Sequence, residues 1–362
     1  MFDFSTLTGP IHEWLSASLS PGWVTTIEWA VIGVSLILFA AVSVIILVYV
    51  ERKVAAFFQL RIGPNRVGKW GIFQTIADFL KLLMKEHITS KHADKFLFNL
   101  APFIIVIASF LGLGAIPFAL GLQVFDPNIG VFYISAASSV GVLGILLGGW
   151  AGNNKYSLIG ALRSGAQVLS YELSILLSIL TMVVLTGSLQ LSEIIQSQAD
   201  GWWIFKGHIP AVIAFIIYLI AGTAETNRGP FDLAEAESEL TAGFHTEYSG
   251  IKFAMFFLAE YIALVIIAAI GATVFLGGWM PFHIGGWMPG AEGFNAAMDY
   301  IPPLVWFIGK IAFLIWVIMW FKWTFPRLRI DQILILEWKY LLPINLVNLI
   351  LVSLIALMGW HF

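Results

Sequence analysis

Acidic residues crowd into one stretch of this chain. Seven of its 22 Asp and Glu residues lie between positions 225 and 260: Glu225, Asp232, Glu235, Glu237, Glu239, Glu247 and Glu260. Apolar runs flank the stretch, and Glu260 itself lies within FAMFFLAEYIALVII. Carboxylates are costly beside hydrocarbon and are rare there unless they face a polar cavity or carry ions. Like charges this dense titrate as a coupled set, so the stretch is predicted to exchange protons when a nearby charge changes.

An acidic loop in water is the alternative reading of part of this stretch. Four of the acids are spaced by 7, 3 and 4 residues and share one face if the backbone stays helical: Glu225, Asp232, Glu235 and Glu239. Gly229-Pro230 is expected to break that helix. The loop reading has real weight for Glu237 and Glu247, but it does not explain Glu260 inside an apolar run.

A second polar group follows the first long apolar run. Glu51 is the first residue after that run and precedes two basic residues, and QLRIGPNRVG follows at 59–68 with Arg61 and Arg66 around a turn. A basic stop at the lipid headgroups accounts for Lys53. It does not account for Glu51.

A third polar group precedes another apolar run. Steps of four residues place Arg163, Gln167 and Tyr171 on one helix face, with Glu172 adjacent. A packed structural acid is the alternative for Glu172. We favour a proton-carrying role, because burial of a carboxyl favours its protonated form, and we place Arg163 with it in the expected charge relay.

A lone lysine occurs in the seventh apolar run. Lys310 lies too deep to reach the headgroups easily, so an intramembrane carboxylate is its expected partner, with Glu172 or Glu260 as candidates. Simple snorkelling is the alternative for Lys322, near the end of the same run.

The composition is that of an integral membrane protein. Hydrophobic residues make up 59% and charged residues only 11% of the chain, whereas soluble domains are about a quarter charged. There is no cysteine, which excludes disulfides and Cys-ligated zinc or iron–sulfur clusters on this chain. The seven histidines show no metal-site spacing and are expected to have structural or solvated roles.

The predicted fold is all-α: a polytopic membrane protein of about eight transmembrane helices in a single membrane domain, 1–362, plus an amphipathic surface helix. Apolar runs of spanning length lie at about 27–50, 98–121, 131–150, 163–187, 209–228, 251–277, 303–324 and 340–360. Residues 1–26 are predicted to form an outer amphipathic segment. Within the inner loop 51–97, apolar residues at 3–4 spacing predict the surface helix at 70–86. That helix is read either as a plain membrane anchor or as one wall of a portal for a lipid-like substrate.

Lys and Arg predict the topology. Seventeen of the 19 basic residues fall in or beside four alternate connections, which are therefore expected to face the cytoplasm. The acidic loop 225–250 lies on that inner side. Both termini are expected on the outer side.

These motifs resemble one known family. ERK…QLRIGPNRVG…DFLKLLMKE (51–86), KYSLIGALRSGAQVLSYEL (155–173), AETNRGPFDLAEAESELTAGFHTEYSG…FLAEY and PRLRIDQ…WKYLLP (326–343) match, in order and spacing, the quinone-chamber membrane subunit of respiratory complex I, the H subunit of NADH:quinone oxidoreductase. The resemblance covers essentially the whole chain.

The resemblance implies roles for particular residues. It places at the quinone cavity and subunit junction Glu51, Arg52, Arg61, Arg228, Asp232, Glu235, Glu237 and Glu239. It places in an acidic chain toward the proton-pumping subunits Glu172, Glu225, Glu247 and Glu260, and Lys310 matches a family lysine. No catalytic or metal-ligating residue is implied on this chain.

The resemblance also implies partners and cofactors. Ubiquinone or menaquinone is the expected substrate, while NADH, FMN and the iron–sulfur clusters belong to partner subunits. The expected partners are soluble quinone-site and iron–sulfur subunits on the inner face, small and antiporter-like membrane subunits, and the lipid bilayer; no nucleic acid is expected. The expected location is the bacterial cytoplasmic (inner) membrane.

The match has departures and two alternatives. The family usually has Arg where this chain has Lys322, and Tyr where it has Ile330; a bidentate contact and a phenol are therefore missing. One alternative is the homologous membrane anchor of a related hydrogenase, formate- or F420-linked complex. The other is a stand-alone transporter, which the long motif-rich inner loops and the absence of internal symmetry disfavour.

Overall fold

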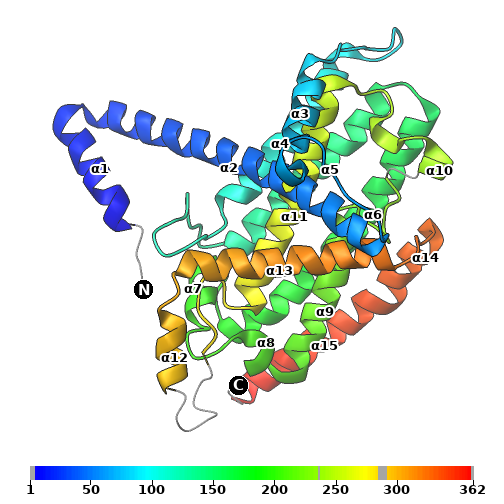
Figure 1. Ribbon diagram of the computed structural model, residues 1–362. Helices are drawn as coiled ribbons and strands as arrows, with labels where there is room; N and C mark the ends of the chain where they lie inside the picture. Colours follow the sequence, from blue (N-terminus) through cyan, green and yellow to red (C-terminus); the bar gives the residue numbers. More distant parts are fainter. Residues whose placement is uncertain (1–4, 235–236, 284–291, 360–362) are drawn as a thin grey trace.

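The structure is a computed structural model that describes residues 5–234, 237–283 and 292–359 as a bundle of helices (Figure 1). Within these residues the backbone forms no strand beyond one isolated bridge between Ala119 and Leu122. Of the acidic stretch, Glu235 and the side chain of Glu237 lie outside the described residues. The predicted all-α class is confirmed.

Eight helices in the described chain are long and apolar enough to cross a bilayer. They are α2 (Pro21–Phe58), α4 (Lys95–Gly114), α5 (Gly130–Ala151), α6 (Lys155–Thr186), α9 (His208–Glu225), α11 (Gly250–Phe275), α13 (Pro303–Thr324) and the continuous run Ile330–Leu357. That last run is made of α14 (Ile330–Ile335), the π-helical turn η3 (Leu336–Leu341) and α15 (Leu342–Leu357). The predicted number of spans is confirmed, and the bounds predicted for α13 match those observed.

Three spans are longer than their apolar runs predicted, and one of them, α6, begins at Lys155 instead of about 163. α2 has 38 residues and is therefore about 57 Å long, well above the roughly 30 Å of a hydrocarbon core. The last span begins at Ile330, ten residues before the predicted start, because Glu337 and Lys339 ended the apolar run in the sequence. Glu337 consequently lies inside a membrane helix and is fully buried.

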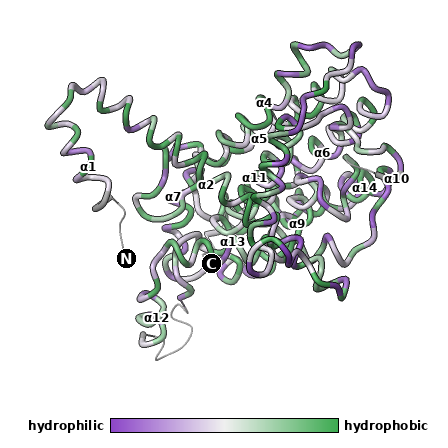
Figure 2. Tube along the Cα trace, turned by 45° about the horizontal axis from the view of Figure 1, so that its top comes forward, coloured by the Kyte–Doolittle hydropathy of each residue, from purple (hydrophilic) through white to green (hydrophobic). Residues whose placement is uncertain are grey.

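The bundle is organised around α11. This helix contacts α2, α3 (Gln74–Met84), α4, α9 and α13, and nearly all of its second half is buried. In contrast, α2 extends away from the bundle with α1 (Ser5–Ser18) folded back at its far end (Figure 1). Hydrophilic segments gather on the side of the molecule that bears α10 (Glu237–Leu240) (Figure 2).

Short helices complete the connections. The other short elements are η1 (Lys69–Gly71), α7 (Leu191–Gln196), α8 (Trp203–Lys206), η2 (Gly243–His245) and α12 (Glu292–Asp299). The predicted surface helix is present as η1 and α3, and its apolar side chains are exposed, including Phe73, Phe79 and Leu83. An exposed apolar face on a short charged helix is typical of a helix lying along a membrane surface.

Glycine allows α5 and α6 to pack closely. A Cβ on Gly149 would lie 2.3 Å from the Ala161 Cβ and 2.6 Å from the Ser157 carbonyl oxygen. A Cβ on Gly141, in the same helix, would lie 3.8 Å from its nearest neighbour, the Ala108 Cβ. Only the first position therefore requires glycine for packing.

We expect G149A to lower the free energy of unfolding by about 1–3 kcal/mol, because the added methyl group overpacks a helix interface and meets backbone that has nowhere to move. The matched variant G141A should be neutral or slightly stabilising, since alanine favours helix over glycine. The measurement is the fraction of fluorescently tagged chain that stays monodisperse after heating in detergent. Equal melting of the two variants would contradict this packing.

Candidate functional site

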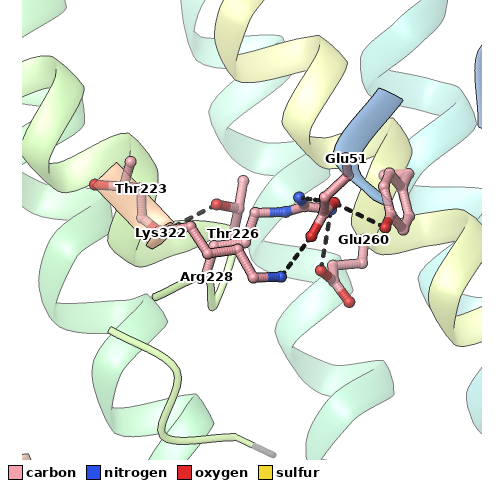
Figure 3. A network of polar contacts seen from close by, with 7 residues as sticks. Glu51, Thr223, Thr226, Arg228, Glu260 and Lys322 are labelled. Atoms are coloured by element: carbon pink, nitrogen blue, oxygen red, sulfur yellow. Dashed lines mark hydrogen bonds and ion pairs between the residues drawn. The ribbon is translucent and has the colours of Figure 1, made fainter. Parts of the chain in front are cut away.

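A buried set of charges joins three transmembrane helices and one loop (Figure 3). We call Glu51, Arg228, Glu260, Tyr261 and Lys322 the charged network. The Glu51 carboxylate accepts from Arg228 Nη1 at 2.6 Å, from Lys322 Nζ at 2.6 Å and from the Tyr261 hydroxyl at 2.8 Å. Glu51 is only 7% exposed, so these contacts offset the cost of taking its charge out of water.

Arg228 is the second centre of the charged network. It is 1% exposed, lies 3.3 Å from Glu260 and stacks its guanidinium 4.4 Å from the centre of the Tyr261 ring. Burial alone would lower the pKa of Arg228, but the carboxylates of Glu51 and Glu260 outweigh it and raise the pKa above its ordinary value. Arg228 therefore stays cationic at any physiological pH.

The loop after α9 places Arg228. Helix α9 ends at Glu225, and Asn227 takes a positive φ of 50°, which asparagine tolerates better than most residues. From α6, the Gln167 side chain donates to the carbonyl oxygens of Ala224 and Phe231 at 2.7 and 2.8 Å. These two bonds tie the end of α9 and the loop that follows it to α6. The single helical face predicted conditionally for the acids does not form, since the helix ends before Asp232.

The largest described cavity, about 470 Å³, opens beside the charged network. We call it the large cavity. Its apolar part comes from α2 and α11, with Val44, Val48, Phe253 and Phe257 among the lining residues. Its polar part is lined by Glu51, Arg52, Arg61, Asp78, Lys81, Arg228, Asp232, Glu260 and Lys322. A cavity of this size, lined by both apolar and charged side chains, has the dimensions of a small-ligand site.

The surface helix α3 forms one wall of the large cavity. Asp78 of α3 accepts from Arg52 at 2.5 Å, and Thr75, Phe79 and Leu82 also line the space. Arg61, in the loop between α2 and α3, donates to Gln59 at 2.6 Å. The structure therefore brings Glu51, Arg52, Arg61, Arg228 and Asp232 to one cavity; that this is the quinone cavity implied by the family resemblance stays a prediction.

Two smaller cavities continue from the large one toward α5. The middle cavity, about 120 Å³, shares Glu260 and Asn227 with the large cavity and is also lined by Glu225. The small cavity, about 40 Å³, shares Glu225 and Ser138 with the middle cavity and is lined by Glu172. Glu172 accepts from Ser138 at 3.3 Å and also from Ser139. Glu260, Glu225 and Glu172 thus line a series of three neighbouring cavities.

Two predicted acids lie apart from these cavities. Glu239 is exposed and pairs with Arg163 at 2.5 Å; hydrogen bonding from Arg163 holds the pKa of this carboxyl below its ordinary value. Glu247 is half-buried and accepts from Asn154 at 2.7 Å. The described acids of the stretch are therefore spread over several environments instead of forming one coupled set.

The partner expected for Lys310 was wrong. Its ammonium donates to the carbonyl oxygens of Gly278 and Met280 at 2.8 and 2.6 Å and lies 4.3 Å from the Trp202 ring. Neither Glu172 nor Glu260 is its partner, because the loop after α11 folds over the lysine and supplies backbone oxygens at the opposite end of the bundle. A role for Lys310 in charge relay stays a prediction.

Sequence reasoning missed four polar residues of the interior. Tyr261 follows Glu260 directly in an apolar run, which could have signalled a shared site. Lys322 was read as snorkelling, yet it pairs with Glu51. Asp78 lies in the surface helix predicted at 70–86 but was not singled out there. Glu337 was placed in a loop because the last span was predicted to begin at about residue 340. Among the described residues no cluster of three His, Asp or Glu side chains is arranged to hold a metal ion.

The family model and the relatives that match this chain all point to one family. A family model described as NADH dehydrogenase matches residues 31–353. Proteins named as the H subunit of NADH-quinone oxidoreductase, from Bacteroides fragilis and Phocaeicola vulgatus, are 62% and 60% identical over 362 residues, covering all of each chain. The protein of the same name from Brevibacillus brevis is 45% identical over 337 residues, which is 93% of this chain and 96% of the relative.

We expect R228Q to lower the free energy of unfolding by about 3–5 kcal/mol, because it leaves the buried carboxylates of Glu51 and Glu260 short of their main counter-ion. The control is R52Q, which removes a pair whose arginine side chain is 44% exposed and should cost no more than about 1 kcal/mol. Denaturant unfolding of the two purified variants measures the difference. Similar costs for both would show that the charged network is solvated.

His245 should make stability depend on pH. It lines the middle cavity, and burial lowers its pKa from 6.5 to about 4, so the folded chain binds fewer protons than the unfolded one. Stability should be complete above about pH 6.5 and fall as the pH drops toward 4, by up to about 3 kcal/mol. H245N should remove this dependence, whereas H92N, at an exposed position, should keep it. An unchanged pH profile in H245N would contradict the burial of a neutral imidazole.

Proposed function

Because this chain belongs to the NADH dehydrogenase family, we propose that it is the membrane subunit of a proton-translocating NADH:quinone oxidoreductase, in which the large cavity receives quinone. The observation that carries the proposal is the shape and lining of that cavity. It has an apolar wall of α2 and α11 side chains and a charged end at Glu51, Arg228 and Lys322. Quinones combine an apolar tail with a polar head group, so the two parts of the lining fit the two parts of the substrate.

The surface helix supports access from the lipid. α3 presents exposed apolar side chains, while its residues Thr75, Asp78 and Leu82 line the cavity. A substrate dissolved in the bilayer would pass between α3, α2 and α11 without crossing water. In this proposal α3 is a wall of the portal as well as a membrane anchor.

The series of cavities supports proton coupling. Reduction of a quinone takes up protons and changes the charge at the polar end of the large cavity. Glu260 belongs both to the charged network and to the middle cavity, which leads by way of Glu225 to Glu172. We propose that Glu260, Glu225 and Glu172 pass protonation changes toward neighbouring membrane subunits. In this proposal the charge relay also includes Glu247, Arg163 and Lys310.

The remaining parts of the proposal concern location and partners. The basic connections face the cytoplasm of a bacterial inner membrane, and both termini lie outside. Soluble subunits that carry NADH, FMN and iron–sulfur chemistry dock on the inner face, where Glu239 and Arg163 are exposed or partly exposed. Glu235 and Glu237 belong to the same junction in this proposal.

The test introduces a bulky side chain into the apolar lining of the large cavity. Ala254 lines the large cavity, and A254F should raise the KM for quinone by about tenfold or more, equivalent to about 1.4 kcal/mol of lost binding. Oxidation of NADH by an artificial acceptor should not change, because that reaction does not use quinone. Both rates are measured on the purified complex.

The matched control is A356F, which adds the same ring at an exposed position on α15. It should leave both rates unchanged. Quinone kinetics in A254F equal to those of A356F would refute a quinone site in the large cavity, and a complex that copurifies with a nickel–iron subunit instead of bound quinone would favour the hydrogenase-type alternative.

A further inference from the structure

The last transmembrane span packs along α6 through buried polar side chains. α6 contributes Ser174 and Ser178, both fully buried, and the last span contributes Glu337 and Asn345, also fully buried. We call these four residues the α6 polar cluster. It lies outside the three cavities described above.

Hydrogen bonds hold the α6 polar cluster together. The Ser174 hydroxyl donates to Glu337 Oε1 at 2.5 Å. The Asn345 amide donates to the Ser174 carbonyl oxygen at 2.7 Å and to the Ser178 hydroxyl oxygen at 2.8 Å. Every donor on Asn345 is therefore used, and Ser174 links the glutamate to the asparagine.

Two buried acceptors in the cluster have no donor. Neither Glu337 Oε2 nor Asn345 Oδ1 accepts a hydrogen bond in the described structure. Buried polar atoms are nearly always hydrogen-bonded, and an ionised carboxylate without a counter-ion is among the costliest groups to bury. Within the described residues no Lys, Arg or His forms an ion pair with Glu337. The cluster therefore buries a carboxylate that has neither a counter-ion nor a full set of hydrogen bonds.

The backbone aims Glu337 into this position. Residues Leu336–Leu341 form a π-helical turn between α14 and α15. Such turns insert one extra residue into a helix and are frequent at functional sites. Here the glutamate turns toward α6, while Trp338, the next residue, is 55% exposed.

We propose that the α6 polar cluster is a proton-binding site, in which Glu337 is a neutral carboxylic acid with its proton on Oε2. Oε1 is then the carbonyl oxygen that accepts from Ser174. Protonation removes the buried charge and places a hydrogen on Oε2, which otherwise has no hydrogen-bond partner.

Among the described residues, the groups that face Glu337 provide no positive charge. From α6, the titratable neighbour is Tyr171, whose hydroxyl donates to the Ile333 carbonyl oxygen at 2.9 Å. Trp338 donates to the Ser170 hydroxyl oxygen. Glu172 lies next to Tyr171 in sequence but faces Ser138 and Ser139 of α5. Glu337 lies on the last span and faces α6, so the proposed site is separate from the series of cavities and independent of the proposed quinone function.

Infrared difference spectroscopy of the purified complex tests the proposal at pH 8. Subtracting the spectrum of E337Q from that of the wild type should leave a carbonyl band of a protonated carboxylic acid, and deuterium oxide should shift the band to lower frequency. The control subtraction uses E86Q at an exposed position, and it should leave only carboxylate bands.

S174A keeps the test decisive if E337Q does not assemble. Loss of the serine hydrogen bond should shift the protonated-acid band of Glu337 to higher frequency. Carboxylate bands in place of the acid band, in the difference spectrum of either variant, would overturn the proposal. So would an acid band that appears only without Na⁺, because a metal cation would then be the ligand of these oxygens.

Discussion

The structure depends on how the charge of Glu51 is held inside the bundle. Three donors from three different segments converge on this one carboxylate: Arg228 from the loop after α9, Lys322 from α13 and Tyr261 from α11. A buried carboxylate needs such partners, so the segments that carry them are fixed relative to α2. The rigid charged end of the large cavity is the consequence.

The same network connects the large cavity to the interior. Glu260 shares Arg228 with Glu51 and also borders the middle cavity. A change of charge at the polar end of the large cavity is therefore felt by an acid that faces the next space, without any movement of a helix. Coulomb interactions over such distances are strong where little water is present. This is the physical basis for coupling substrate chemistry to protonation in the proposed function.

Sequence reasoning succeeded where one strong local signal was present. Hydropathy located eight spans, and the bounds of α13 were predicted because the run from Pro303 to Thr324 is apolar except at Lys310 and Lys322. It failed where the partner came from a distant segment. Nothing local shows that Lys322 pairs with Glu51, 271 residues away, or that backbone oxygens of a loop would hold Lys310. Glu337 was missed because a charged residue in an apolar run looks like the end of a helix, whereas here it lies inside the span with one oxygen hydrogen-bonded by Ser174 of α6.

The central claim is that the charged network forms the polar end of a quinone site. Photo-crosslinking of the intact complex with an azido-quinone, followed by peptide mapping, tests it most directly. The account predicts label on α2, α3 and α11 residues that line the large cavity, and loss of that label when unmodified quinone is in excess. Label confined to other subunits, or to lipid-facing residues of this chain that excess quinone does not protect, would contradict the account.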